Sequence, residues 1–76
     1  MEELRELLAQ LKPEIDFENE KELIDGGVFT SFDVITLIAE LEERYALEIP
    51  AEEIVPENFN SAEGILKLIE RLKEEA

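Results

Sequence analysis

The chain has 76 residues, of which 45% are hydrophobic and 37% charged, so we expect a single globular domain, residues 1–76, with one modest core. Its 21 acidic residues outnumber the 7 basic ones and leave a net charge of −14. Such a surface repels the phosphates of nucleic acids and anionic lipids, so we expect no nucleic-acid partner and protein partners that present basic patches. Repulsion among these charges also opposes folding, and salt should relieve it by screening.

The missing residue types exclude much covalent chemistry. Histidine, cysteine and tryptophan are absent, which rules out Ser-His-Asp and Cys-His catalysis and the commonest zinc sites. Carboxylate pairs such as Glu42 and Glu43 belong to solvated runs, and the Asp25-Gly26-Gly27 turn lacks the ligand spacing of a calcium loop. We therefore predict no catalytic residue, no metal site and no enzymatic activity of the chain itself.

Several features bear on the location of the protein. The first residues are acidic, unlike the basic start of a signal peptide, and no apolar run approaches the roughly 20 residues that span a bilayer. The absence of cysteine is compatible with a reducing compartment. We expect a cytoplasmic protein with no membrane span.

Leucines predict the first helix. They recur at i, i+3, i+4 and i+7, which places them on one stripe of a helix that ends near Lys12-Pro13: Leu4, Leu7, Leu8 and Leu11. From Glu14 to Thr30 this periodicity lapses, which indicates a long loop. We expect its apolar residues to pin it to the core: Ile15, Phe17, Leu23, Ile24 and Val28.

The second helix is predicted to begin at Thr30-Ser31, where a hydroxyl and Asp33 fit a capping box. Ser31 therefore lies at a helix N-terminus, and the residues alone favour a simple capping role for it. The buried stripe of this helix is Val34, Leu37, Ile38, Leu41 and Tyr45. Its far side carries Asp33, Thr36, Glu40 and Glu43, with Ile35, Ala39 and Glu42 between the two faces.

Proline ends this part of the pattern. Ile49-Pro50 breaks the chain, and a short helical turn at residues 51–55 is expected to follow before Pro56 stops it. Either Asn60 or Ser61 can cap a last helix, whose buried stripe is Ile65, Leu68, Ile69 and Leu72. The sequence thus predicts an all-α bundle of three main helices and one short one, with a long loop between the first two.

The run Asp25-Gly-Gly-Val-Phe-Thr-Ser-Phe-Asp-Val34 resembles the Asp-Ser-Leu segment of acyl carrier proteins, with Ser31 at the modified serine. The resemblance continues through residues 37–45, 48–54 and 58–65, and so covers nearly the whole chain. The serine motif alone is weak. Its combination with the Glu-Ile-Pro break, the final capped helix, the length and the acidity is specific.

This resemblance implies a small three- to four-helix acyl-carrier-like bundle. A phosphopantetheinyl transferase would join a 4'-phosphopantetheine arm from coenzyme A to the Ser31 hydroxyl, and the arm's thiol would carry an acyl or aminoacyl group as a thioester. The implied partners are this transferase and the enzymes that load the arm or accept its acyl group, which are expected to present basic patches. We expect the carrier itself to be a monomer. A chain without cysteine and histidine fits such borrowed chemistry.

For docking, the resemblance points to acidic residues of the second helix: Asp33, Glu40, Glu42 and Glu43. We add Ile35 and Ala39 as candidates for an apolar contact ringed by these acids, the alternative being peripheral core packing. Thr36 stands where an acidic residue is common in the family. Core residues could instead line a slot for an attached chain, although packing already explains them: Val34, Leu37, Leu41, Leu68 and Leu72.

Two residues next to Ser31 also depart from the family pattern. Thr30 stands where an aspartate usually precedes the serine, and Phe32 replaces the usual leucine. The loss of the aspartate motivates an alternative hypothesis, a degenerate carrier without the arm that acts as a non-catalytic acidic protein–protein interaction module. The carried group stays open, because fatty acyl, polyketide, D-alanyl and other aminoacyl carriers share this scaffold.

Overall fold

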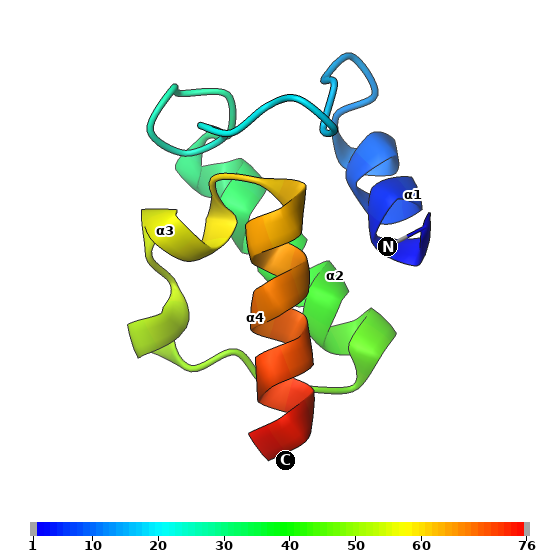
Figure 1. Ribbon diagram of the computed structural model, residues 1–76, viewed down its shortest axis with the longest axis vertical. Coiled ribbons are helices and arrows are strands. Elements are labelled where there is room, and N and C mark those ends of the chain that lie inside the picture. Colours follow the sequence, from blue (N-terminus) through cyan, green and yellow to red (C-terminus); the bar gives the residue numbers. More distant parts are fainter. Residues whose placement is uncertain (1, 76) are drawn as a thin grey trace.

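The computed structural model describes residues 2–75 of the chain. Its elements are, in order, α1 (Glu2–Leu11), α2 (Ser31–Tyr45), the 3₁₀ turn η1 (Ala51–Glu53), α3 (Pro56–Phe59) and α4 (Ala62–Glu75). Figure 1 shows α4 in front of α2, with α1 and α3 on either side and the long loop crossing one end. The predicted all-α bundle with a long loop between its first two helices is confirmed.

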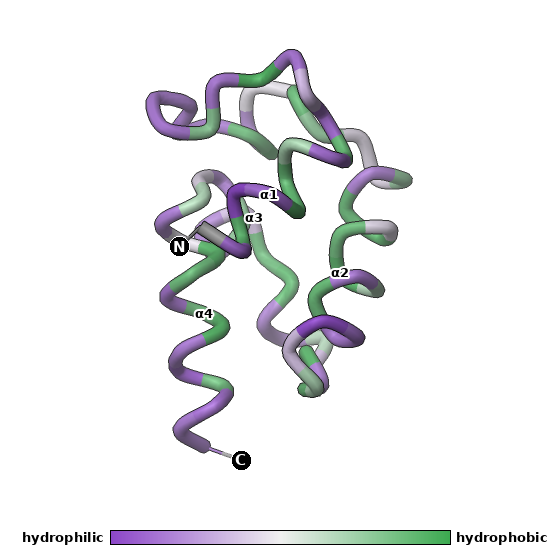
Figure 2. The backbone as a smooth tube through the Cα atoms, turned by 90° about the vertical axis from the view of Figure 1, so that its right-hand side faces the viewer, coloured by the Kyte–Doolittle hydropathy of each residue, from purple (hydrophilic) through white to green (hydrophobic). Residues whose placement is uncertain are grey.

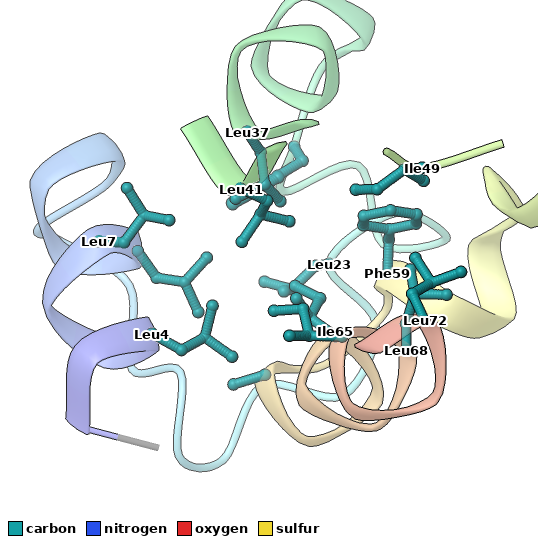
Figure 3. Packing of buried hydrophobic residues seen from close by; sticks show 14 residues of the cluster. Leu4, Leu7, Leu23, Leu37, Leu41, Ile49, Phe59, Ile65, Leu68 and Leu72 are labelled. Carbon is teal, nitrogen blue, oxygen red and sulfur yellow. The ribbon is translucent and has the colours of Figure 1, made fainter. Parts of the chain in front are cut away.

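The core forms where the leucine and isoleucine stripes of the helices meet (Figure 3). In α1 the predicted stripe is buried at Leu4, Leu7 and Leu8, and in α4 all four predicted positions are buried. α2 contributes Leu37 and Leu41, both fully buried, while the rest of its stripe is only partly covered. Figure 2 shows the hydrophobic residues of α4 on the side that faces the rest of the molecule and the hydrophilic residues on the opposite side, as expected of an amphipathic helix.

The long loop is fixed to the bundle by Asn60. The Asn60 side-chain oxygen accepts hydrogen bonds from the backbone N–H groups of Ile24 and Asp25, each at 3.0 Å. The Asn60 backbone carbonyl accepts from the N–H of Leu23 at 2.9 Å. The predicted anchors Ile15, Phe17, Leu23, Ile24 and Val28 all lie in or against the core. Phe29, which the sequence analysis did not select, is also buried, and its ring meets the Phe17 ring edge-on with the two ring centroids 6.1 Å apart.

The connection between α2 and α4 differs from the prediction at Pro56. The predicted turn is present but ends at Glu53, and Pro56 begins α3 instead of stopping a helix. Proline suits the first position of a helix because an N–H at that position would have no partner within the helix, so its absence costs nothing. Of the two candidate caps for α4, Ser61 is the one that acts: its hydroxyl accepts from the N–H of Gly64 at 3.0 Å.

None of the helices within residues 2–75 is long and apolar enough to cross a membrane.

Candidate functional site

The start of α2 is held by a complete capping box. Thr30 is the N-cap: its hydroxyl oxygen accepts from the N–H of Asp33 at 3.1 Å, and the Asp33 carboxylate accepts from the N–H of Thr30 at 3.0 Å. The predicted capping box is therefore confirmed, and it fixes the backbone on both sides of Ser31.

Ser31 is the first residue of α2, and its side chain is exposed. Because Thr30 makes the capping bond, the interpretation of Ser31 as the helix cap is wrong. The bonds of the capping box leave out the Ser31 hydroxyl, which stands at the positive end of a 15-residue helix.

Asp33 is also tied to the end of α1. The Lys12 ammonium lies 3.1 Å from the Asp33 carboxylate, and only about a quarter of each side chain is exposed, 26% and 25%. The hydrogen bond from the Thr30 N–H, aided by Lys12 and opposed by partial burial, lowers the pKa of Asp33 below its usual value. This carboxylate is thus charged but committed to two internal partners.

The other predicted docking residues fall into two groups. Ile35 is 67% exposed, Ala39 and Glu43 are exposed, and Glu40 is partly exposed, so α2 presents these four to the surface. Glu42 is different, because its carboxylate turns back and accepts from the N–H of Ile49 at 3.0 Å. Asp33 and Glu42 therefore serve the fold itself.

Phe32 is a surface residue that the sequence analysis did not select for docking. It is 76% exposed, the largest exposed fraction among the large hydrophobic residues of the described chain. Its spacing of three and seven residues from Ile35 and Ala39 was the available signal, since these intervals place residues on one side of a helix.

A small apolar cavity of about 80 Å³ opens near the site. It lies between the loop, α2 and the η1–α3 connection, and is lined by Ile24, Val34, Ile54, Val55, Pro56 and Phe59. Among the core residues considered as a slot for an attached chain, Val34 lines this cavity, one helical turn beyond Ser31. The other residues considered for this slot lie in the buried core: Leu37, Leu41, Leu68 and Leu72. Leu72 also lines a separate groove at the C-terminal end of α2.

The wall of this cavity is fastened to α4. Arg71 donates from Nη1 and from Nη2 to the two carboxylate oxygens of Glu53, each at 2.8 Å, and the Asn58 side-chain amide donates to the Glu53 carbonyl at 2.8 Å. The Arg71 hydrogen bonds lower the pKa of Glu53. This arrangement holds the η1–α3 connection, which includes Ile54, beside α4.

A larger groove of about 460 Å³ lies at the C-terminal end of α2, and Glu42, Glu48 and Glu75 are among its lining residues. Within the described part of the chain, no group of three or more carboxylates is arranged to hold a metal ion.

Comparison with known proteins gives the family. The family described as phosphopantetheine attachment site matches residues 2–73. Aminoacyl carrier protein 1 of Bradyrhizobium diazoefficiens is 33% identical over 63 residues, which cover 83% of this chain and 69% of that protein. The D-alanyl carrier proteins of Streptococcus sanguinis and Streptococcus thermophilus are each 32% identical over 54 residues, 71% of this chain and 68% of each relative. No solved structure gives a significant match. Because the family match spans nearly the whole chain, the protein belongs to the phosphopantetheine-attachment family of carrier proteins, whose cofactor is covalently attached 4'-phosphopantetheine.

Proposed function

We propose that the chain carries an acyl or aminoacyl group as a thioester on a 4'-phosphopantetheine arm joined to the Ser31 hydroxyl. The observation that supports this most directly is the exposed Ser31 side chain, freed from capping by Thr30, on a backbone fixed by the capping box. The first-turn N–H groups of α2 and the positive end of its dipole favour a phosphodiester at this place. The arm would supply the thiol that the chain lacks.

Within this proposal, a small aminoacyl-type group is the better-supported cargo. The relatives described above are named aminoacyl and D-alanyl carriers. The apolar cavity near Ser31 is small, about 80 Å³. A long acyl chain would have to enlarge this cavity or stay in water, and each exposed CH₂ forgoes about 0.8 kcal/mol of burial.

The attachment is tested by incubating the purified chain with a broad-range phosphopantetheinyl transferase and coenzyme A. We expect the intact mass to rise by one phosphopantetheine group, and Ser31→Ala to abolish the rise. Ser61→Ala is the matched control, because it also removes a serine hydroxyl, one that caps α4 and does not belong to α2. A mass gain in Ser31→Ala, or none in the native chain with several transferases, would contradict the proposal.

A degenerate carrier that acts only as an acidic interaction module is the second candidate, and Thr30 favours it because the family usually has aspartate there. The two candidates make opposite predictions. If the arm is essential, a native host that carries Ser31→Ala loses the function of this protein. If the chain is only an interaction module, Ser31→Ala binds the partner as well as the native chain does. Modification that appears only after Thr30→Asp would also favour the degenerate carrier.

As a carrier, the chain would act as a monomer in the cytoplasm and visit the transferase and the enzymes that load and unload the arm. The net charge of −14 supports partners with basic patches.

A further inference from the structure

The exposed turn in the loop before α2 contains the only Asp-Gly bond of the chain, Asp25-Gly26. Glycine has no side chain to shield its backbone nitrogen and leaves the backbone unusually free. In a flexible chain this nitrogen attacks the preceding aspartate more readily than at the other two aspartates, which precede Phe17 and Val34. The sequence therefore places one aspartate where the backbone can rearrange without an enzyme.

The rearrangement needs no reactant other than water. The Gly26 nitrogen forms a bond to the side-chain carbon of the protonated Asp25 carboxyl group, and the carboxyl hydroxyl leaves as water with the proton of the N–H. Water then opens the cyclic imide at either carbonyl, adding its hydroxyl to that carbon and a proton to the nitrogen. Opening at the former backbone carbonyl gives an isoaspartyl residue, whose main chain is longer by one methylene.

The fold requires the glycine that makes this bond reactive. A Cβ atom on Gly26 would lie 2.7 Å from the carbonyl oxygen of Glu22, and the Gly26 N–H donates to that same oxygen at 2.7 Å. This close approach belongs to a turn whose two ends are buried and joined, since the Phe29 N–H donates to the Leu23 carbonyl at 2.8 Å. A larger residue at position 26 would have to move the turn.

In the folded chain, both groups that would react have other partners. The Gly26 N–H is bound to the Glu22 carbonyl, and the Asp25 carboxylate accepts from Nδ2 of Asn60 at 2.9 Å. The Asn60 side-chain oxygen also holds the N–H groups of Ile24 and Asp25, each at 3.0 Å. Attack requires the carboxyl group to leave Asn60 and the Gly26 nitrogen to lose its proton, and these bonds oppose both.

We propose that Asp25-Gly26 is a latent isoaspartate site, which Asn60 protects while the loop is closed and which reacts when the loop opens. Local openings of this kind are more frequent than global unfolding. The added methylene displaces the carboxylate from Asn60, so an isomerised loop loses part of its anchor. Asp25 and its two following glycines are exposed, so the product is accessible to a methyltransferase that recognises the α-carboxylate of isoaspartyl residues. The inference does not depend on attachment at Ser31.

The test compares the native chain with Asn60→Ala and Asn19→Ala during several weeks at neutral pH and physiological temperature. Isoaspartate is measured with a purified isoaspartyl methyltransferase, as methyl groups transferred from labelled S-adenosylmethionine. Digestion with a protease that cleaves before aspartate but not before isoaspartate assigns the signal to Asp25. The same digestion separates it from isoaspartate that Asn60 itself would form by loss of ammonia. Circular dichroism at the start verifies that each variant is folded.

We expect Asn60→Ala to form isoaspartate at position 25 about tenfold faster than the native chain, the loss of about 1.4 kcal/mol of loop anchorage. Asn19→Ala should match the native chain, because Asn19 bonds only to Asp16. The native chain unfolded in guanidinium chloride should react at least as fast as Asn60→Ala. Asn60→Ala/Asp25→Glu should form none at this position, because glutamate would have to close a larger and less favourable ring.

Asn60→Asp separates the two roles of the Asn60 side chain. It keeps an acceptor for the N–H groups of Ile24 and Asp25 but loses the donor to the Asp25 carboxylate. Faster isomerisation in this folded variant would show that the donor protects Asp25, and an unchanged rate would assign the protection to the acceptor.

The proposal is overturned if the folded native chain isomerises at Asp25 as fast as the unfolded chain, because the closed loop then gives no protection. This comparison holds whether or not Asn60→Ala folds. Equal rates at Asp25 in the native chain and in folded Asn60→Ala would show that Asn60 is not the protecting residue. An unfolded chain whose isoaspartate maps only to other residues would show that Asp25-Gly26 is not a reactive site.

Discussion

The hydroxyl of Thr30 caps α2, and this frees the hydroxyl of the next residue for another role. Two adjacent residues with the same functional group are thereby separated into a structural one and an exposed one. The separation depends on backbone conformation, because the N-cap at φ −83° and ψ 171° lies outside the helix and Ser31 lies inside it.

Thr30→Ala should therefore destabilise the fold without touching Ser31. The loss of an N-cap costs about 1 kcal/mol, which lowers the Tm of a domain of this size by about 4–8 °C. Thr30→Ser keeps the hydroxyl and should unfold near the temperature of the native chain. Thermal unfolding followed by circular dichroism measures both, and an unchanged Tm for Thr30→Ala would show that Ser31 takes over the cap.

The Asp33 carboxylate should add a pH-dependent part to stability. Its pKa is lowered in the folded chain from an ordinary value of 3.8, chiefly by the Thr30 N–H and also by Lys12. A lowered folded pKa means that the contribution is complete above pH 3.8 and is lost as the pH falls through the folded pKa. The native chain should be more stable than Asp33→Asn at pH 7 and pH 5, with the difference disappearing towards pH 2. Urea midpoints across this range measure it, and a difference that persists at pH 2 would contradict the charged pair.

Helical spacing placed Glu40 and Glu43 on the outer side of α2 but left Ile35 and Ala39 between the two faces, and the structure exposes both. Spacing also gave no sign of which docking candidates have internal partners. The bond from Glu42 to Ile49 and the pair between Asp33 and Lys12 join separate segments of the chain. No local pattern encodes such contacts, because they depend on how the segments pack.

At the scale of elements, the three longer helices were predictable because each carries a complete amphipathic stripe. α3 was not, because it has only four residues and its proline signal is ambiguous. Proline stops a helix that precedes it and equally starts one that follows it. The order of the long loop was likewise predictable from its apolar residues, whereas its attachment to Asn60, some 35 residues away, was not.

The Asn60 side chain should be the main polar anchor of this loop. It accepts from the N–H groups of Ile24 and Asp25 and donates to the Asp25 carboxylate at 2.9 Å. Asn60→Ala removes these bonds and should destabilise the chain by about 1–3 kcal/mol. Amide exchange at residues 23–29 should rise more than in the helices.

Asn19→Ala serves as the control for this prediction. Asn19 is exposed and bonds only locally, to the Asp16 carboxylate at 2.7 Å, so its replacement should leave exchange at residues 23–29 unchanged. Equal exchange in this segment for Asn60→Ala and the native chain would show that the apolar residues alone hold the loop.

At the scale of the whole molecule, α2 connects stability with recognition. Its inner side places Leu37 and Leu41 in the core, and its outer side carries Ser31, the exposed Phe32 and, about two to three turns farther along, Glu40 and Glu43. Because the inner side of α2 is packed in the core, a partner that docked on the outer side would meet a fixed surface at little ordering cost. The surface charge that we expect to draw basic partners also acts on the fold, where it opposes compaction.

Salt should therefore stabilise this protein at neutral pH. The molecule measures 33 × 24 × 20 Å, and the Debye length falls from about 30 Å at 0.01 M salt to about 10 Å at 0.1 M. At low salt each carboxylate is thus repelled by the whole excess of −14, whereas at higher salt only neighbouring charges interact. The ion pairs Arg5–Glu18 and Lys67–Glu63 would weaken, but exposed pairs are worth only about 0–1 kcal/mol each.

We expect the Tm at pH 7 to rise by several degrees between about 10 and 300 mM NaCl, because screened repulsion outweighs the weakened ion pairs. Near the isoelectric point of about 4.1 the net charge vanishes, so the same salt series should leave the Tm nearly constant or lower it slightly. Calorimetry at both pH values separates the effect of screened repulsion from that of the weakened ion pairs. A Tm that falls with salt at pH 7 would mean that the ion pairs, and not the excess of carboxylates, dominate the electrostatic free energy of the fold.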